Sequence, residues 1–126
     1  MNIEDLREYC ISLPEVEECF PFDEVTLVMK TGGKMFALIP LDEVETCISV
    51  KCNPELAVEL RETYSCVQPA FHMNKTHWNT VFVTTEISEN QIKKWIKHSY
   101  DLVKAKLPKR SSLILPNQVQ GKPLKE

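Results

Sequence analysis

Apolar residues recur at helical spacing in three segments of the chain. The first lies between Asn2, a favourable helix N-cap, and Pro14, and predicts a helix over about residues 3–12. The second begins at Asn53-Pro54, where asparagine caps and proline at the first helical position loses no hydrogen bond, and should end near Tyr64.

The third predicted helix is long and amphipathic. It begins at Ser88, which together with Gln91 has the form of a capping box, and it ends before Pro108. Lysines occupy its outer face. Its expected buried face consists of Ile92, Trp95, Ile96, Ser99 and Val103.

Between the first two helices the apolar pattern changes to that of strands. Thr26–Lys30 and Met35–Ile39 flank Gly32-Gly33, and a glycine pair supplies the positive φ that a tight hairpin turn requires. Thr46–Lys51 alternates as a third strand. The acidic segment Glu15–Glu18, which precedes these strands, is expected to be a loop.

A second hairpin is expected between the second and third helices. Its strands are Val67–Met73 and Trp78–Val83, and it should turn at Asn74-Lys75 because asparagine tolerates left-handed backbone geometry. Hairpin-linked strands indicate an antiparallel sheet of about five strands with helices packed on one face. The sequence therefore predicts an α+β domain in the order helix, three strands, helix, two strands, helix.

Length and composition agree with one such domain. The chain has 126 residues, 43% of them hydrophobic, which is enough for a real core, and no run reaches the ~18 apolar residues of a membrane span. We expect the domain over residues 1–108 and a loosely ordered tail over residues 109–126, which holds two prolines and a glycine.

Location inside the cell follows from the first residues and the cysteines. The acidic N-terminus has neither the basic nor the apolar region of a signal peptide. Five scattered cysteines, an odd number without a C-x-x-C pair, are typical of reduced thiols in the cytosol. A cytoplasmic protein is expected.

The charges are unevenly distributed along the chain. Residues 1–25 carry a net charge of −7, residues 26–66 carry −2 and residues 67–126 carry +6, which gives −3 overall. Such asymmetry is a hint of an anionic partner. Attraction between the two halves across the fold would explain it equally well.

The polar segment His72–Asn79 contains the residue types most suited to chemistry. Two histidines five residues apart make a poor zinc site without a third ligand, and no nucleophile or carboxylate accompanies them in a catalytic motif. The chain has no phosphate-binding loop and no dinucleotide-binding motif. We expect no metal, no cofactor and no enzymatic activity.

Nucleic-acid binding is the function that the lysines favour. Lys34 follows the turn of the first hairpin and Lys75 lies in the turn of the second, where an ammonium group can meet phosphates while His77 and Trp78 lie near the contact surface. Further phosphate contacts are expected from Lys93, Lys97, Lys104, Lys109 and Arg110. Ordinary solvation of lysines on turns and helices is the plain alternative.

The string from His72 to Val81 is the most specific of several segments that together form a recognisable pattern. The others are Phe20–Glu24, Gly33–Leu38, Lys51–Ala57, His98–Val103 and Lys106–Lys109. In order along residues 1–110, the segments resemble the MmcQ/YjbR family of small bacterial proteins.

The resemblance implies a CyaY-like α+β fold and a DNA-binding protein with a double wing of two hairpins. The two lysine-bearing hairpins are the natural candidates for these wings. A low isoelectric point, about 5.7, is unusual for a protein that binds duplex DNA. A protein-interaction or small-ligand module that uses the His72–Asn79 segment is therefore the alternative function.

Overall fold

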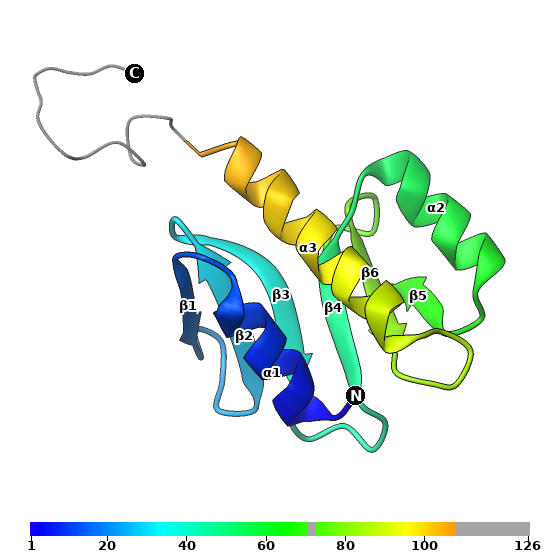
Figure 1. Cartoon of the computed structure of the whole chain (residues 1–126), viewed down its shortest axis with the longest axis horizontal. Helices are drawn as coiled ribbons and strands as arrows, with labels where there is room; N and C mark the ends of the chain where they lie inside the picture. Colours follow the sequence, from blue (N-terminus) through cyan, green and yellow to red (C-terminus); the bar gives the residue numbers. More distant parts are fainter. Residues whose placement is uncertain (71–72, 108–126) are drawn as a thin grey trace, which may run out of the picture.

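The computed structural model describes residues 1–70 and 73–107, which form one antiparallel sheet with three helices on one of its faces (Figure 1). The predicted α+β class, antiparallel sheet and one-sided helical layer are confirmed. The strand order is β1-β2-β3-β4-β6-β5. The elements are α1 (Ile3–Ser12), β1 (Val16–Cys19), β2 (Thr26–Thr31), β3 (Lys34–Pro40), β4 (Cys47–Lys51), α2 (Pro54–Thr63), β5 (Val67–Pro69), β6 (Trp78–Phe82) and α3 (Glu89–Ala105).

The sheet has six strands in the described part of the chain, one more than the sequence predicts. The expected loop Glu15–Glu18 is mostly strand β1, which pairs with β2 in antiparallel register. Its only half-buried residues are Val16 and Cys19, so the strand lacks the alternating pattern by which it would be predicted. Glu17 and Glu18 are exposed on this edge strand, and charged residues there discourage pairing with another sheet.

Local signals at the helix ends act largely as predicted. Asn2 caps α1 in a complete capping box with Asp5, and Asn53 caps α2 with proline at its start. Ser88 caps α3 through the backbone of Gln91. The Gln91 side chain does not complete that box: its amide donates to the hydroxyl of Tyr64 at 2.9 Å.

The three helices close one continuous core over the sheet. Leu6 of α1, Ala57 of α2 and Ile96 of α3 are fully buried against strand residues such as Phe36 and Ile48. On the opposite face a smaller apolar cluster is buried, formed by Val28, Leu38, Ala70 and Trp78. The cores on the two faces explain why β2 and β3 each contain an unbroken apolar run, Leu27–Met29 and Met35–Ile39.

Helix α3 crosses the sheet and makes most of the helix–sheet contacts. Its predicted buried residues are confirmed except that Trp95 is only half-buried, where it packs against Tyr64 at 5.4 Å between ring centroids. Tyr100 is an additional buried residue, in an edge-to-face contact with Phe36. None of the helices in the described residues has the length and apolarity to cross a bilayer.

The tail predicted for residues 109–126 lies outside the described residues, as does residue 108 at the expected domain end.

Candidate nucleic-acid interface

Both hairpin turns with lysines lie at the same end of the sheet. Strand β3 begins at Lys34, β4 ends at Lys51 and β6 begins at Trp78. Because these three strands are neighbours and antiparallel, those residues meet at one end, here called the lysine end. The turn between β2 and β3 and the chain before β6 both project from it, at the top of Figure 1.

The first turn has the conformation that its glycines favour. Gly32 and Gly33 adopt positive φ angles of 59° and 79°, and Thr31 pairs with Lys34 directly across the two-residue turn. Leu107, just beyond α3, packs on this turn so closely that a Cβ on Gly32 would lie 2.4 Å from its Cδ1. The exposed Lys34 therefore stands on a turn that α3 holds in place.

The second turn is at the predicted position but has a different geometry. Among the described residues Glu15 alone, glycines apart, has a positive φ, so the left-handed conformation expected at Asn74 is wrong. Instead the Asn74 side chain accepts from the backbone of Thr76 at 2.9 Å, and its carbonyl accepts from His77 and Trp78. Strand β5 also ends at Pro69, four residues earlier than predicted.

A buried amide and an arginine fix this second turn to α2. The Arg61 guanidinium donates to the carbonyl of Lys75 at 3.0 Å and to the side-chain oxygen of Asn79 at 2.8 Å. Asn79 is 1% exposed and donates in turn to the carbonyl of Ala57. Asn79, from the polar segment singled out in the sequence, is thus a structural residue that positions the exposed Lys75.

The aromatic residues of that segment are less accessible than expected. Trp78 is 6% exposed and packs in the small apolar cluster with Val28 and Leu38, so its ring is not available to stack on a base. His77 is half-buried, and its carbonyl accepts from the backbone of Cys52 at 2.7 Å. His72 lies outside the described residues.

The lysines of α3 proposed as phosphate contacts all have carboxylate partners. Lys93 lies 3.4 Å from Glu89, and Lys97 lies 2.9 Å from Asp101. Lys104 pairs with Glu15 at 2.8 Å. Phosphate would have to displace these carboxylates before it could bind the three lysines. Lys109 and Arg110 lie outside the described residues.

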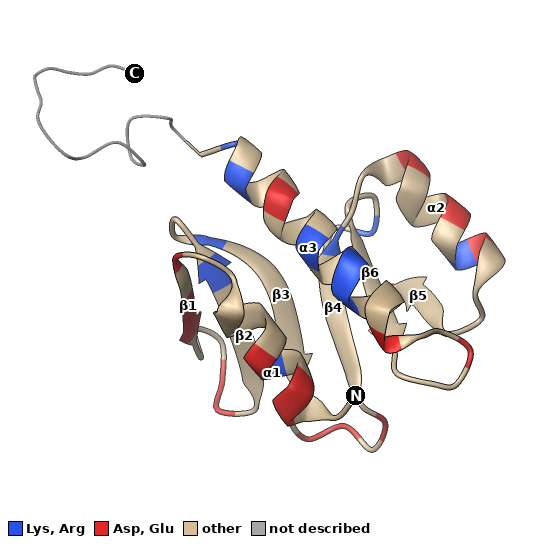
Figure 2. Ribbon diagram, in the orientation of Figure 1, with Lys and Arg blue, Asp and Glu red and all other residues tan. Residues whose placement is uncertain are grey.

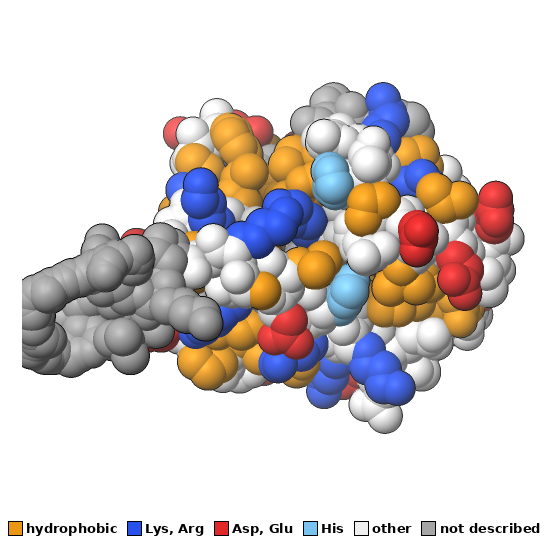
Figure 3. Space-filling view, turned by 90° about the horizontal axis from the view of Figure 1, so that it is seen from above, with side chains coloured by type: hydrophobic (Ala, Val, Ile, Leu, Met, Phe, Trp, Pro, Cys, Tyr) orange, Lys and Arg blue, Asp and Glu red, His pale blue; other side chains and the backbone are white. Residues whose placement is uncertain are grey.

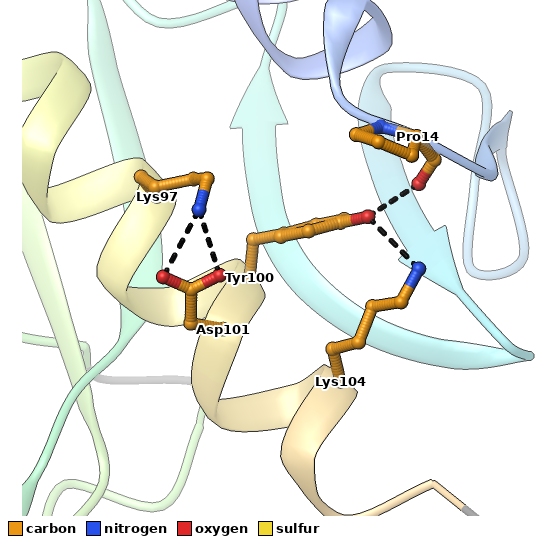
Figure 4. A network of polar contacts seen from close by, with 5 residues as sticks. All are labelled: Pro14, Lys97, Tyr100, Asp101 and Lys104. Atoms are coloured by element: carbon orange, nitrogen blue, oxygen red, sulfur yellow. Dashed lines mark hydrogen bonds and ion pairs between the residues drawn. The ribbon is translucent and has the colours of Figure 1, made fainter. Parts of the chain in front are cut away.

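Lys104 also connects α3 to the segment between α1 and β1. It donates to the hydroxyl of Tyr100 at 3.2 Å, and that hydroxyl donates to the carbonyl of Pro14 (Figure 4). The Lys104–Glu15 pair joins the basic and acidic halves of the chain, as the alternative explanation of the charge asymmetry requires. Among the ion pairs of the described residues, it is the one that joins residues 1–25 to residues 67–126.

Acidic residues in Figure 2 lie on α1, β1, α2 and the loops at the lower end, whereas basic residues lie on α3, together with acidic ones, and at the upper ends of β2 and β3. Viewed onto the lysine end, Lys and Arg side chains gather across the middle of the surface between hydrophobic ones (Figure 3). Lys51 and Lys106 lie here too, beside Lys34. Sequence reasoning missed both, although Lys51 closes a strand at the same end as the two turns.

Metal and thiol chemistry receive no support from the described residues. Within them, no three His, Cys, Asp or Glu side chains are grouped as ligands for a metal ion. The five cysteines are free, and four are buried. Burial raises the pKa of the Cys10 thiol to about 12, which leaves little thiolate to act as a nucleophile near neutral pH.

The fold defines a class of small α+β proteins with an open antiparallel sheet. Solved structures with this fold are similar to the chain along most of its length. A Deinococcus radiodurans protein, DR2400, with a DUF419 domain matches with a TM-score of 0.83 and 34% identity, covering 98% of this chain and 96% of that one. A Pseudomonas syringae protein matches with a TM-score of 0.71 and 26% identity, covering 82% and 99%.

Sequence comparison identifies the family within this class. A family model described as YjbR matches residues 11–102. The Escherichia coli K12 protein YjbR is 32% identical over 115 residues, covering 91% of this chain and 98% of the relative. The YbdF protein of E. coli O157:H7 is 36% identical over 107 residues, covering 85% and 88%. The chain belongs to the YjbR family, which confirms the resemblance found in its sequence.

Proposed function

We propose that the protein binds duplex DNA without catalysing a reaction on it, and that Lys34 and Lys75 contact phosphates from the two hairpin turns. The observation that carries the proposal is the shared position of the turns at one end of the sheet. One strand, β4, separates β3 from β6, so the two turns are at least about 10 Å apart. The major groove of B-DNA is about 12 Å wide, so lysines at this separation suit the phosphates on its two sides.

The charge distribution supports the same surface. Many acidic residues lie away from the lysine end, on α1 and the loops at the lower end (Figure 2). A negative polymer approaching the lysine end therefore meets a more positive field than the net charge of −3 implies. An interaction of this kind is read through phosphates and is independent of base sequence. We expect weak affinity that falls steeply with salt.

Fluorescence anisotropy of a labelled duplex, and of a single strand, at two salt concentrations tests the proposal. Each neutralised phosphate contributes about −0.9 to the slope of log affinity against log salt, so two lysines predict a slope near −2. The double variant Lys34→Glu/Lys75→Glu should abolish binding. Arg7→Glu/Lys94→Glu is the matched control, because it changes net charge equally at basic residues of α1 and α3 outside the two turns. The proposal would be wrong if the protein bound no DNA at low salt, or if its affinity for DNA did not change with salt.

A small-ligand function is the second candidate, and one observation favours it. Met73 and Trp78, from the polar segment His72–Asn79, line a hollow at the lysine end. A concave surface suits a small molecule better than it suits a duplex.

A further inference from the structure

Three lysines from separate elements converge on one hollow at the lysine end. Lys34 comes from the start of β3, Lys51 from the end of β4 and Lys106 from the residue after α3. They are close enough that the charges of Lys106 and Lys34 both act on Lys51. The hollow has a volume of about 400 Å³, within the range of roughly 300–1,000 Å³ typical of small-molecule sites.

The three ammonium groups are uncompensated in the described part of the chain. No carboxylate lines the hollow, and none of the described acids forms an ion pair with Lys34, Lys51 or Lys106. Partial burial, together with the two neighbouring cations, lowers the pKa of Lys51. Like charges held together in this way favour an anion of high charge, which relieves the repulsion of all three.

The rest of the wall is apolar and adaptable. Trp78 lies directly opposite Lys51 in the pairing of β4 with β6, so the indole ring flanks the lysine stem. Two flexible thioether side chains, Met35 and Met73, complete this side. Methionine and tryptophan surfaces suit a flat or apolar group, and methionine can adjust to its outline.

The hollow is held by contacts that do not depend on a ligand. The Ser99 hydroxyl accepts from the backbone of Lys51 at 2.8 Å and donates to the carbonyl of Phe36 at 2.6 Å, which fixes the end of β4 against β3 and α3. Leu107 packs on Gly32 and so sets the end of α3 beside the first turn. These contacts keep the three lysines together before any anion arrives, which reduces the cost of binding.

We propose that this hollow binds a phosphate monoester that carries an aromatic or apolar group, with Lys34, Lys51 and Lys106 around the phosphate. Met35 and Met73, which pack on the cluster of the buried Trp78, contact the apolar part. A phosphate monoester carries a charge of about −1.5 to −2 near neutral pH, and its three oxygens suit three donors. The inference does not rest on duplex binding, since its ligand is a free monoester or the terminal phosphate of a strand.

Tryptophan fluorescence of a Trp95→Phe variant provides the test, because Trp78 is then the one tryptophan and it lines the site. Phenyl phosphate should change the emission and bind at least about tenfold more tightly than inorganic phosphate, while phenol should not bind. Lys51→Met in this background should weaken phenyl phosphate about tenfold or more. Lys30→Met, a half-buried lysine on β2 outside the hollow, should have no effect.

The outcomes separate this inference from the duplex proposal. If Lys75→Glu loses duplex binding but still binds phenyl phosphate, the monoester site is separate from the contact that Lys75 makes with the duplex. Equal affinities for phenyl phosphate and inorganic phosphate, or no effect of Lys51→Met, would overturn the monoester site even if duplex DNA binds. A single strand bearing a 5′-phosphate that competes with phenyl phosphate, while its 5′-hydroxyl form does not, would identify a strand terminus as the source of the phosphate. Competition by adenosine 5′-monophosphate but by neither strand would identify a free monoester.

Discussion

The hydroxyl group of Ser99 donates a hydrogen bond of 2.6 Å to the carbonyl of Phe36, 63 residues earlier in the chain. Strands β3 and β4 pair at Ala37–Val50 and Leu38–Ser49, and Phe36 would face Lys51 next. At that position the Ser99 hydroxyl is inserted and bonds to both strands. A side chain of α3 therefore takes the place of one backbone hydrogen-bonded pair between β3 and β4. Beyond it the two strands diverge toward the lysine end (Figure 1).

Replacing Ser99 with alanine should destabilise the fold markedly. The change leaves the carbonyl of Phe36 and the N–H of Lys51 without their partner, and an unsatisfied buried group costs about 1–3 kcal/mol. Urea unfolding measures the loss. Ser12→Ala, which removes an exposed hydroxyl bonded within its own helix, should cost much less. Equal losses in the two variants would contradict the bridging role.

The two turn glycines should respond differently to alanine. Both have positive φ, which costs a side chain about 1–2 kcal/mol, but only at Gly32 does the new Cβ meet Leu107. Gly32→Ala should therefore lower the free energy of unfolding more than Gly33→Ala does. Combining Gly32→Ala with Leu107→Ala should remove the excess in a double-mutant cycle. An additive cycle would mean that the Leu107 side chain moves aside without lowering the free energy of unfolding.

Removal of the Arg61 side chain should loosen the turn that holds Lys75. Arg61→Met takes the donor from the buried Asn79 and from the Lys75 carbonyl, so local opening of the turn becomes easier. We expect faster amide hydrogen exchange at His77 and Trp78. Arg7→Met, which breaks an ion pair with Glu18 on α1 and β1, is the control and should leave these amides unchanged. Unchanged exchange in both variants would contradict the role of Arg61 in holding the turn.

Glu86 predicts a pH dependence of stability. A hydrogen bond from the Cys66 thiol, and then those from Ser65, lower the pKa of its carboxyl against the opposing effect of burial. The unfolded carboxyl titrates near about 4.3, so this stabilisation is complete above that pH and is lost as the pH falls through the lower folded pKa.

Glu86→Gln should therefore reduce Tm at pH 7 and make little difference at the lowest pH at which the protein still folds. Thermal unfolding across this pH range measures the gap between the two proteins. Glu62→Gln, at an exposed position of α2, should leave Tm unchanged throughout. A gap for Glu86→Gln that stays constant with pH would contradict the assigned ionised state.

The parts of the fold with strong local signals were predictable from sequence. Gly32-Gly33 fixed the first hairpin and Asn53-Pro54 the start of α2, because each signal acts within a few residues. Strand β1 was not predictable, since it is held by pairing with β2 and its exposed residues are acidic. Local chemistry also misled at Asn74, where the side chain and carbonyl form the turn without left-handed geometry.

The residues of the candidate site were likewise predictable where local signals place them and unpredictable where long-range packing does. The exposed lysines of the two turns follow from hairpin positions, and both turns occur where predicted. The burial of Trp78 and the approach of Lys106 to Lys51 depend on how α3 and the chain before β6 pack on the sheet. Such long-range packing has no periodicity from which it can be predicted.

The dependence of the sheet on α3 has a consequence for synthesis on the ribosome. The helix supplies Ser99 to β3 and β4, and Tyr100 and Lys104 reach back to Pro14 and Glu15, 86 and 89 residues away. When the strands of a nascent chain have left the ribosome but α3 has not, no α3 is present to cover the apolar face of the sheet. The domain should thus complete folding only after nearly all of its residues have left the exit tunnel, and until then its apolar strands are exposed to chaperones.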